Sequence, residues 1–470
     1  MFVAIVAALR LVIGADASDV PIQFAGDLTS DQHEHVLEHP FTVPKGVARI
    51  DVKLEYTGKE RRTVLDLGLR SPTGVRGWSG GRESAVHVST LTATPGYLPG
   101  PIEPGRWTVI LGVPNIRRES RDSYSVTITF DPVPLRAAPP LRNEAAWYAG
   151  DLHLHSGHSD ARATTRSGAP MPAPVHRVLD HASASGLDFV ALTDHNTGAH
   201  WLDVDRLQAY YDTLLLLHGR EITTYRGHAT SVGESSLTDF TLASPILALR
   251  PLLRRVALGG AFVSINHPRR PDDETCMGCG WNDTSLDILK SVHGVEAVNG
   301  EDWKTPGYGW PFWADALNRG ARLALVGGSD DHTPENTSDI RAGSPTTVVF
   351  ASSLSEPAIV EGLHSGRTYV RVRDPNGPSI ELTALTESGL YEVGDTIYQP
   401  CSTIAFEAIV TGARGQTLQW IRRGIPVKMV QIDEEGVMRA NLTAHPGDWF
   451  SVVVSDEHGP TLLTSAIYTE

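Results

Sequence analysis

The chain has 470 residues, which at about 100–200 residues per domain predicts two to four domains. Its 40 Lys and Arg against 55 Asp and Glu give a formal net charge of −15, which excludes sequence-independent nucleic-acid binding and disfavours an anionic membrane surface as a partner. Apolar residues make up 41% and charged residues 20%, a globular composition that excludes disorder as the main state.

An apolar run at residues 2–13, interrupted by Arg10, opens the chain. Residues 15–17 then fit an A-x-A cleavage pattern, so residues 1–17 are predicted to be a signal peptide and the protein to be secreted or periplasmic. The alternative is a buried N-terminal strand or a mis-chosen start codon, with a cytoplasmic protein. No later run approaches the roughly 18 apolar residues of a membrane span, so none is predicted. The sequence leaves the oligomeric state open.

Short alternating apolar runs separated by Gly and Pro characterise both ends of the chain, and their length and spacing predict β-sandwiches. The N-terminal sandwich is predicted at residues 18–134, with runs at 48–56, 63–70, 106–113 and 123–130. The C-terminal sandwich is predicted at residues 378–470, with runs at 402–410, 417–423 and 448–455.

Residues 147–373 alternate strand-like runs with helix-like segments, which predicts an α/β region with parallel strands. Helices are predicted at residues 174–185 and 311–319, each followed by a glycine. A third helix is predicted from a capping box of Ser353 and Glu356 to Gly366.

Seven segments of this region share one design, in which a short apolar run ends in a side chain that can bind a metal ion. His153 and His155 are two residues apart, so on a strand both side chains point to the same face. The side chains that do the chemistry of parallel β/α barrels lie at such strand ends. The candidate ligands are His153, His155, Asp160, His195, Glu221, His228, His267, Asp330 and His332.

Nine candidate ligands are too many for one tetrahedral metal ion. They predict two or three divalent ions, with a carboxylate such as Glu221 bridging two of them. Mixed imidazole and carboxylate ligands are typical of zinc, manganese or iron.

The segments DLHLHS with Asp160, LTDH, GREI, INHP and GSDDH resemble the motifs of the polymerase and histidinol phosphatase (PHP) superfamily of metallohydrolases. The gaps between them are similar to those of the carbaryl-hydrolase-like branch (CehA/McbA). The resemblance covers about residues 148–373 and implies a distorted (β/α)7 barrel, here flanked by the two sandwiches. It implies that all nine residues are metal ligands, and it implies phosphate-ester hydrolysis in most members and carbamate hydrolysis in that branch. His158 departs from the motif, since no ligand is expected at its offset.

Other side chains beside the motifs suit catalysis and substrate binding. His158 is predicted to protonate the leaving group, and Asp194, with Asp151 and Asp331, to orient ligating imidazoles. Arginines could grip a phosphate or carboxylate, whereas an ordinary surface position is the alternative for each. Those that directly follow a motif are Arg162, Arg166, Arg269 and Arg270.

Several residues keep two interpretations. Glu296 and Asn299 could approach the metal ions or cap a loop. Four tryptophans, Trp281, Trp303, Trp310 and Trp313, could wall an aromatic pocket or pack in the core. Cys276 and Cys279 could form a local disulfide or remain two free thiols, since one C-x-x-C pair is weak evidence for zinc.

These features predict a metal-dependent hydrolase in which a metal-activated hydroxide attacks a small-molecule or glycan-linked ester, most directly a phosphoester. The alternatives are carbamate, ester or amide hydrolysis on the same centre, and a non-catalytic binding protein that keeps the metal scaffold. Serine-esterase and P-loop nucleotidase functions lack their motifs. His293, outside the ligand set, is predicted to lie on a helix surface.

Overall fold

The computed structural model describes residues 21–130, 139–234, 237–240, 249–274, 276, 278–281, 284–305, 307–334, 341–398 and 403–470. The predicted signal peptide and Cys401 lie outside these ranges. The chain divides into two compact units, Met1–Pro134 and Leu135–Glu470. Within the described ranges, none of the helices combines the length and the apolar character that crossing a membrane would require.

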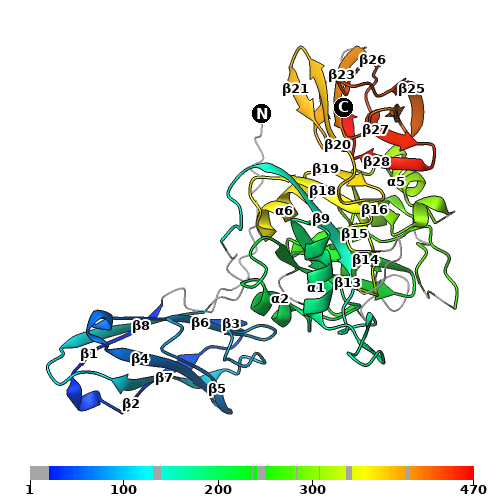
Figure 1. The fold of residues 1–470 in the computed structure, drawn as a ribbon. Coiled ribbons are helices and arrows are strands. Elements are labelled where there is room, and N and C mark those ends of the chain that lie inside the picture. Colours follow the sequence, from blue (N-terminus) through cyan, green and yellow to red (C-terminus); the bar gives the residue numbers. More distant parts are fainter. Residues whose placement is uncertain are drawn as a thin grey trace, which may run out of the picture. The chain divides into compact units, whose positions relative to one another are not determined.

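The first unit contains two four-stranded antiparallel sheets, in the orders β1-β8-β3-β6 and β2-β7-β4-β5 (Figure 1). Alternate residues of both sheets meet in one buried core, which includes Ile50, Val52, Trp107 and Val109. The strands are β1 (Ile22–Leu28), β2 (Val36–Val43), β3 (Arg49–Tyr56), β4 (Val64–Ser71), β5 (Gly74–Gly80), β6 (Ala85–Ser89), β7 (Gly105–Asn115) and β8 (Asp122–Phe130). Short 3₁₀ turns lie at Ser30–Gln32 and Lys59–Arg61.

The second unit is built on a long mixed sheet that begins in the order β17-β16-β15-β14-β13-β12-β9-β18, where β18 is Thr346–Ala351. The pairs β9–β12, β12–β13, β15–β16 and β16–β17 are parallel, as predicted. β14 is antiparallel to both neighbours, so the predicted parallel layout was wrong at this strand. The reason is local, because a tight turn joins β13 directly to β14 without a crossover helix. The strands are β9 (Ala146–Leu154), β12 (Phe189–Leu192), β13 (Leu215–Thr224), β14 (Gly227–Val232), β15 (Phe262–Ile265), β16 (Gly294–Asn299) and β17 (Ala324–Gly328).

The segment after β17 returns to the end of β9. Asp331 forms a parallel bridge with Leu154, the backbone N–H of His155 donates to Asp331 O (3.2 Å), and that of Asp330 donates to His153 O (2.8 Å). Gly328 permits this approach, because a Cβ there would lie 2.3 Å from the His153 Cβ. The first and last strands of the set β9 and β12–β17 are therefore in contact. The predicted (β/α)7 barrel itself stays a prediction.

Helices follow several of these strands. α1 buries Val175, Val178, Leu179 and Ala182, whose helical spacing forms one apolar face, and the chain leaves the helix through Gly186 at φ +75°. The third predicted helix begins later than expected, since Ser355 rather than Ser353 caps it by accepting from the Ala358 N–H. The helices are α1 (Val175–Ala184), α2 (Trp201–Leu207), α3 (Leu249–Leu258), α4 (Leu286–Leu289), α5 (Trp310–Asn318) and α6 (Glu356–His364), with a 3₁₀ turn at Asp302–Lys304 and a short hairpin of β10 (Arg162–Thr164) and β11 (Pro170–Pro172).

The same sheet continues into the C-terminal region, where β19 pairs with β28 in the order β18-β19-β28-β27-β24-β25. A further sheet, β21-β20-β23-β26, contributes Leu382 and Phe406 to a core that it shares with Trp420 and Val452 of the long sheet. The strands are β18 (Thr346–Ala351), β19 (Thr368–Arg371), β20 (Ser379–Thr386), β21 (Gly389–Glu392), β22 (Thr396–Ile397), β23 (Thr403–Thr411), β24 (Thr417–Arg422), β25 (Ile425–Gln431), β26 (Val437–Thr443), β27 (Trp449–Asp456), β28 (Gly459–Thr464) and β29 (Ile467–Thr469).

His218 joins β13 to two helices and gives the second unit a pH-dependent stability. Its Nδ1 lies 2.9 Å from Glu356 Oε2 and its Nε2 lies 3.1 Å from Asp205 Oδ1. Burial alone would lower the pKa of His218, but Glu356 and Asp205 outweigh it and raise this pKa to about 10, above the ordinary 6.5. The stabilisation is therefore full below about pH 6.5 and is lost as the pH rises toward 10.

We expect the free energy of unfolding, measured by urea denaturation, to fall by at least about 1.4 kcal/mol more between pH 6.5 and pH 10 in the wild type than in His218→Gln. His458→Gln is the matched control, because the side chain of His458 is 73% exposed. Equal pH dependence of the wild type and His218→Gln would refute the assignment.

Candidate metal centre

The candidate ligands meet at one edge of the mixed sheet because the strands that carry them end or begin there. β9, β12, β15 and β17 deliver His155, His195, His267 and Asp330 at or just after their carboxyl ends. β14 runs the other way, so its first residues, with His228, lie at the same edge. The turn between β13 and β14 therefore brings His228, at the start of β14, to the edge where the other candidate ligands lie.

Glu221, on β13, is the centre of the cluster. One of its carboxylate oxygens, Oε1, lies 3.3 Å from His228 Nδ1, 3.4 Å from His267 Nε2 and 3.5 Å from His153 Nε2. The other, Oε2, lies 2.7 Å from His195 Nδ1 and 3.7 Å from His155 Nε2. Each oxygen thus faces a different set of imidazoles, which is the arrangement that a bridging carboxylate requires.

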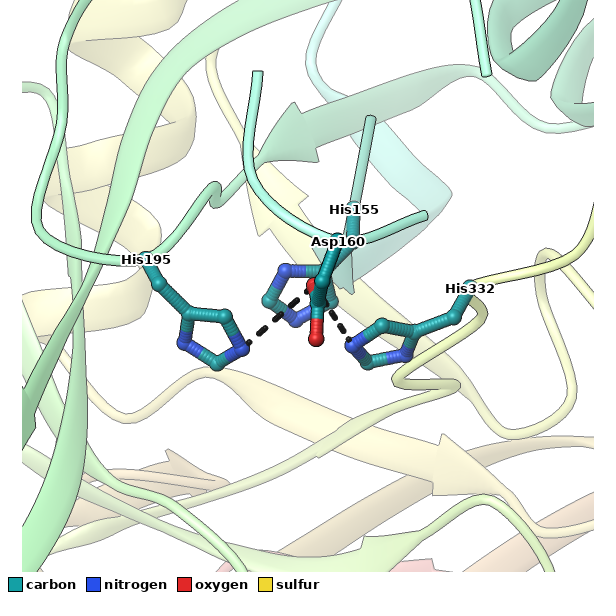
Figure 2. A group of neighbouring side chains, drawn as sticks. All are labelled: His155, Asp160, His195 and His332. Carbon is teal, nitrogen blue, oxygen red and sulfur yellow. Dashed lines mark ion pairs between the residues drawn. The ribbon is translucent and has the colours of Figure 1, made fainter. Parts of the chain in front are cut away.

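Two aspartates also face the imidazoles of the cluster. Asp330 Oδ1 lies 3.2 Å from His155 Nε2 and 3.4 Å from His153 Nε2. Asp160 Oδ1 lies 3.2 Å from His332 Nε2 and 3.7 Å from His195 Nε2. Figure 2 shows His155, His195 and His332 arranged around the Asp160 carboxylate. All nine predicted ligands are thereby brought together.

Three groups of these side chains have ligand atoms within 4.8 Å of one another, close enough to share an ion. They are His155, Asp160, His195 and His332; His153, His155 and Glu221; and His228, His267 and Cys279. The first two groups share His155, so two neighbouring ions would use adjacent sites. The third includes a cysteine that was not predicted as a ligand.

Buried polar atoms test whether these residues fit metal ions. His153 Nε2, His155 Nε2 and Glu221 Oε2 are buried and make no aligned hydrogen bond, although Glu221 Oε2 lies 2.7 Å from His195 Nδ1. Burying such an atom without a partner costs about 1–3 kcal/mol, and coordination of a cation would satisfy all three. Imidazole nitrogens and carboxylate oxygens are also the donors that divalent zinc, manganese and iron accept. The donor set therefore fits divalent metal ions.

The charges in the cluster agree with this fit. Burial would raise the pKa of Glu221, but the surrounding imidazoles, His153 foremost, hold it well below its usual range. Burial lowers the pKa of His155 to about 4, so that its ring is neutral at neutral pH, as a metal ligand must be. Burial would also lower the pKa of His153, yet Asp330, Glu296 and Glu221 hold it well above the ordinary value. The carboxylates thus favour positive charge at this point.

Two of the ligand-bearing backbones are strained. His267 has φ +27° and Asp330 has φ +56°, in the left-handed region that residues with side chains seldom adopt. Such conformations cost about 1–3 kcal/mol each and persist where the surrounding structure enforces them, most often at functional sites.

Behind the cluster, carboxylates and amides orient the ligands. Glu296 Oε1 lies 2.9 Å from His153 Nδ1, while Glu296 Oε2 accepts from the His267 N–H (2.8 Å) and from Asn299 Nδ2 (3.0 Å). The structure thus places both of these residues at the site rather than in a loop cap. Asn266, which the sequence analysis missed, donates to Glu221 Oε1 (2.9 Å). Its position directly before His267 was the available signal.

Asp194 is buried beneath the loop that follows β9. Its carboxylate accepts from the Ser156 N–H (2.8 Å), the Ser156 hydroxyl (2.7 Å) and the Ser159 hydroxyl (2.6 Å), and it lies 3.1 Å from His200 Nδ1. Burial would raise the pKa of Asp194, but His200 and these hydrogen bonds lower it. The contacts make Asp194 a positioning residue for the loop that carries Asp160.

Asp151 and Asp331, the other two predicted orienting carboxylates, accept mainly from backbone groups. Asp151 accepts from the N–H groups of His153 (3.0 Å), Ser329 (3.1 Å) and Gly343 (2.8 Å), and burial raises its pKa to about 6. Asp331 accepts from the Thr333 N–H (2.8 Å). They fix the backbone around the cluster rather than the imidazole rings.

His158 does not join the cluster. Its Nε2 lies 2.9 Å from Asp203 Oδ2, and it lines a pocket of about 450 Å³ together with residues 172–176 and Arg206. The ring faces α2, in agreement with the motif comparison, which expected no metal ligand at this position. Its role as a proton donor stays a prediction.

The three predicted substrate-binding arginines differ in their contacts with the cluster. Arg270 donates to Asp330 Oδ2 (2.8 Å) and to Asn299 Oδ1 (3.4 Å), so it reaches the cluster. Arg162 is exposed on β10, where its backbone N–H donates to His332 O (2.8 Å), and Arg269 is also exposed. Of the three, Arg270 has the contacts of a residue at the site.

Other candidates belong to the core. Trp281 and Trp313 are 5% and 0% exposed, and their Nε1 atoms donate to His228 O (2.9 Å) and Leu323 O (2.9 Å). His293 is not on a helix surface, because its Nδ1 accepts from the Val263 N–H (3.0 Å) and its ring stacks on Phe262. Burial, with His364 nearby, lowers the pKa of His293 to about 4.

No family model and no curated protein matches the sequence. Among solved structures, a two-domain protein from Bacteroides vulgatus, described as containing a predicted PHP-like metal-dependent phosphoesterase, is 19% identical over 71% of this chain and 99% of its own, with a TM-score of 0.39. An amidohydrolase from Chromobacterium violaceum is 18% identical over 39% and 88%, with a TM-score of 0.27. A periplasmic inhibitor of g-type lysozyme from Aeromonas hydrophila is 13% identical over 25% and 93%, with a TM-score of 0.15. Likenesses this low carry no argument about function, which rests on the geometry of the site.

Proposed function

We propose that the protein is a hydrolase that uses two or three divalent ions of zinc, manganese or iron, and that phosphate esters are its substrate class. The observation that carries the proposal is the position of Glu221, whose two oxygens lie 2.7–3.7 Å from five imidazoles. Together with the motif resemblance to the PHP superfamily, this supports membership of that superfamily. The contact between the segment after β17 and β9 supports its distorted (β/α)7 barrel.

In this function the residues of the cluster have separate roles. Glu221, with His153 and His155, would hold one ion, and Asp160, with His195 and His332, would hold a second one. Divalent ions there supply a water molecule of lowered pKa and polarise the ester oxygen. Glu296 keeps His153 oriented, and Asp194 keeps the loop of Asp160 in place.

Arg270 supports the choice of a phosphate ester. Its guanidinium is anchored on Asp330, and its side chain is 45% exposed, so it can receive an anionic group from solvent beside the cluster. Guanidinium groups bind phosphate oxygens in a bidentate way. Trp281 and Trp313 are packed in the hydrophobic core, so they do not form the aromatic wall that an aryl carbamate would favour.

The test uses the purified full-length chain. Elemental analysis should find bound divalent metal, and p-nitrophenyl phosphate or bis-p-nitrophenyl phosphate should be hydrolysed faster than a naphthyl carbamate. Chelation should reduce turnover to background, and the metal found by analysis should restore it, because the residues above need the cation to bind the ester.

The other outcomes decide between functions. Hydrolysis of the carbamate alone would replace the phosphoesterase by the carbamate hydrolase of the carbaryl-hydrolase-like branch. Bound metal without turnover of any ester would indicate the non-catalytic metal scaffold. Full activity after complete removal of metal would refute every form of the proposal.

A further inference from the structure

Cys279 lies at the one candidate ion group that contains sulfur among the described residues. Its Sγ and one ring nitrogen each of His228 and His267 lie within 4.8 Å of one another. Cys279 is 0% exposed, His267 2% and His228 4%, so the three groups face one another in the protein interior. His₂Cys is a donor set that zinc and other soft divalent ions bind.

The surrounding structure holds the cysteine in that position. Trp281 Nε1 donates to His228 O (2.9 Å), the Trp281 N–H donates to Pro268 O (3.0 Å), and His267 Nδ1 lies 3.3 Å from Cys279 O. Gly278 has φ +79°, and a Cβ there would lie 2.1 Å from Thr224 O, at the end of β13. The turn of residues 278–281 is thus tied to the strands and the loop that carry the two histidines.

Cys276 and Cys279 form a disulfide. A thiolate is the form of cysteine that ligates metal ions, so the disulfide withholds this ligand. Glu221 Oε1 lies 3.3 Å from His228 Nδ1 and 3.4 Å from His267 Nε2, so these imidazoles still face the cluster when the disulfide is closed.

We propose that Cys279 is a redox-controlled ligand of the metal centre, which joins His228 and His267 when the disulfide with Cys276 is reduced. The inference rests on the proposed function, because it assumes that the centre binds metal ions. A dithiol supplies two electrons and two protons, the S–S bond breaks, and the dithiol becomes a cyclic disulfide. The Cys279 thiol then loses its proton to solvent on binding the ion, while Cys276 remains a thiol.

Cobalt(II) reports the ligand directly, because a thiolate–cobalt bond gives a near-ultraviolet charge-transfer band in addition to the visible bands of the ion. The full-length oxidised chain is freed of metal, loaded with cobalt(II), and compared with the same protein reduced by a dithiol and separated from it under nitrogen. We expect the visible bands in both states and the charge-transfer band after reduction alone.

Two matched substitutions identify the sulfur. Cys276→Ser leaves Cys279 unable to form the disulfide, so it should show the charge-transfer band without reductant. Cys279→Ser should lack this band in both states while it keeps the visible cobalt bands. Cys401 is unchanged in every variant and therefore contributes the same background.

Cobalt bound by reduced wild type and by Cys276→Ser without the charge-transfer band would overturn the inference and leave the proposed function intact. No cobalt bound in any state would overturn both. Because Cys276→Ser gains a signal rather than losing one, misfolding of Cys279→Ser cannot imitate the expected result.

Discussion

Glu221→Gln is expected to lower turnover by at least about 10²-fold and to reduce the metal content, while the protein stays folded. The substitution keeps the size of the side chain but removes the negative charge that faces five imidazoles. Loss of one strong electrostatic stabiliser lowers turnover by about this factor. Asn266 can still donate to the remaining amide oxygen, so the local structure has a replacement for its hydrogen bond. Steady-state assays, elemental analysis and circular dichroism measure the three quantities.

The matched control for this substitution is Glu361→Gln. Glu361 is exposed on α6 in the same unit, so the same chemical change should leave turnover within a few-fold. Normal metal content and full activity in Glu221→Gln would show that the carboxylate does not bridge ions. His293→Gln would not serve as a control, because His293 is packed against Phe262 and its substitution would report on folding.

Glu234→Gln is expected to lower the free energy of unfolding of the second unit by about 3–5 kcal/mol, the usual effect of breaking a buried ion pair. Glu234 is 4% exposed and Arg220 is 0% exposed, and their side chains lie 2.6 Å apart at Arg220 Nη2 and Glu234 Oε1. Ser231 donates to the same carboxylate (2.7 Å). The amide would leave the Arg220 charge buried without its counter-charge, which equilibrium urea denaturation would register.

Glu434→Gln is the control for Glu234→Gln, since the Arg414–Glu434 pair is 73% and 74% exposed, and exposed pairs contribute about 0–1 kcal/mol. A double variant, Arg220→Met with Glu234→Leu, should recover most of the loss because it leaves no charge unpaired. Equal stability of Glu234→Gln and the wild type would show that the pair does not stabilise the hairpin of β13 and β14. Since Arg220 precedes Glu221, metal content should fall together with stability.

The position of the candidate ligands was predictable because a strand has a simple geometry. Side chains two residues apart on a strand point to the same face of the sheet, so His153 and His155 could be assigned together. Apolar runs that end in polar side chains marked the edge of the sheet at which the candidate ligands lie. The antiparallel course of β14 was not predictable from its apolar pattern, because a buried strand has the same pattern in either direction.

The partners behind the ligands were harder to predict than the ligands. Glu296 contacts His153 across 143 positions of sequence, and Asn266 contacts Glu221 across 45. Contacts between residues so far apart in the chain leave no recognisable pattern in the local sequence. His158 lies three residues from His155, yet its ring bonds to Asp203, because the loop after β9 turns it toward α2. Proximity in sequence to a candidate ligand therefore does not predict the contacts of a residue that lies beyond the end of the strand.

The pairing of β19 with β28 determines how the second unit can be divided. A chain that stops after β19 would leave a row of backbone N–H and C=O groups without partners along that edge, and such an edge pairs readily with other molecules. It would also remove Ser465, whose hydroxyl accepts from the Leu325 N–H (2.7 Å) on β17, and Trp449, which packs on Trp313. The C-terminal region is thus part of the same folding unit as the strands that carry the candidate ligands, and a shortened chain would be expected to aggregate rather than to keep the candidate metal centre assembled.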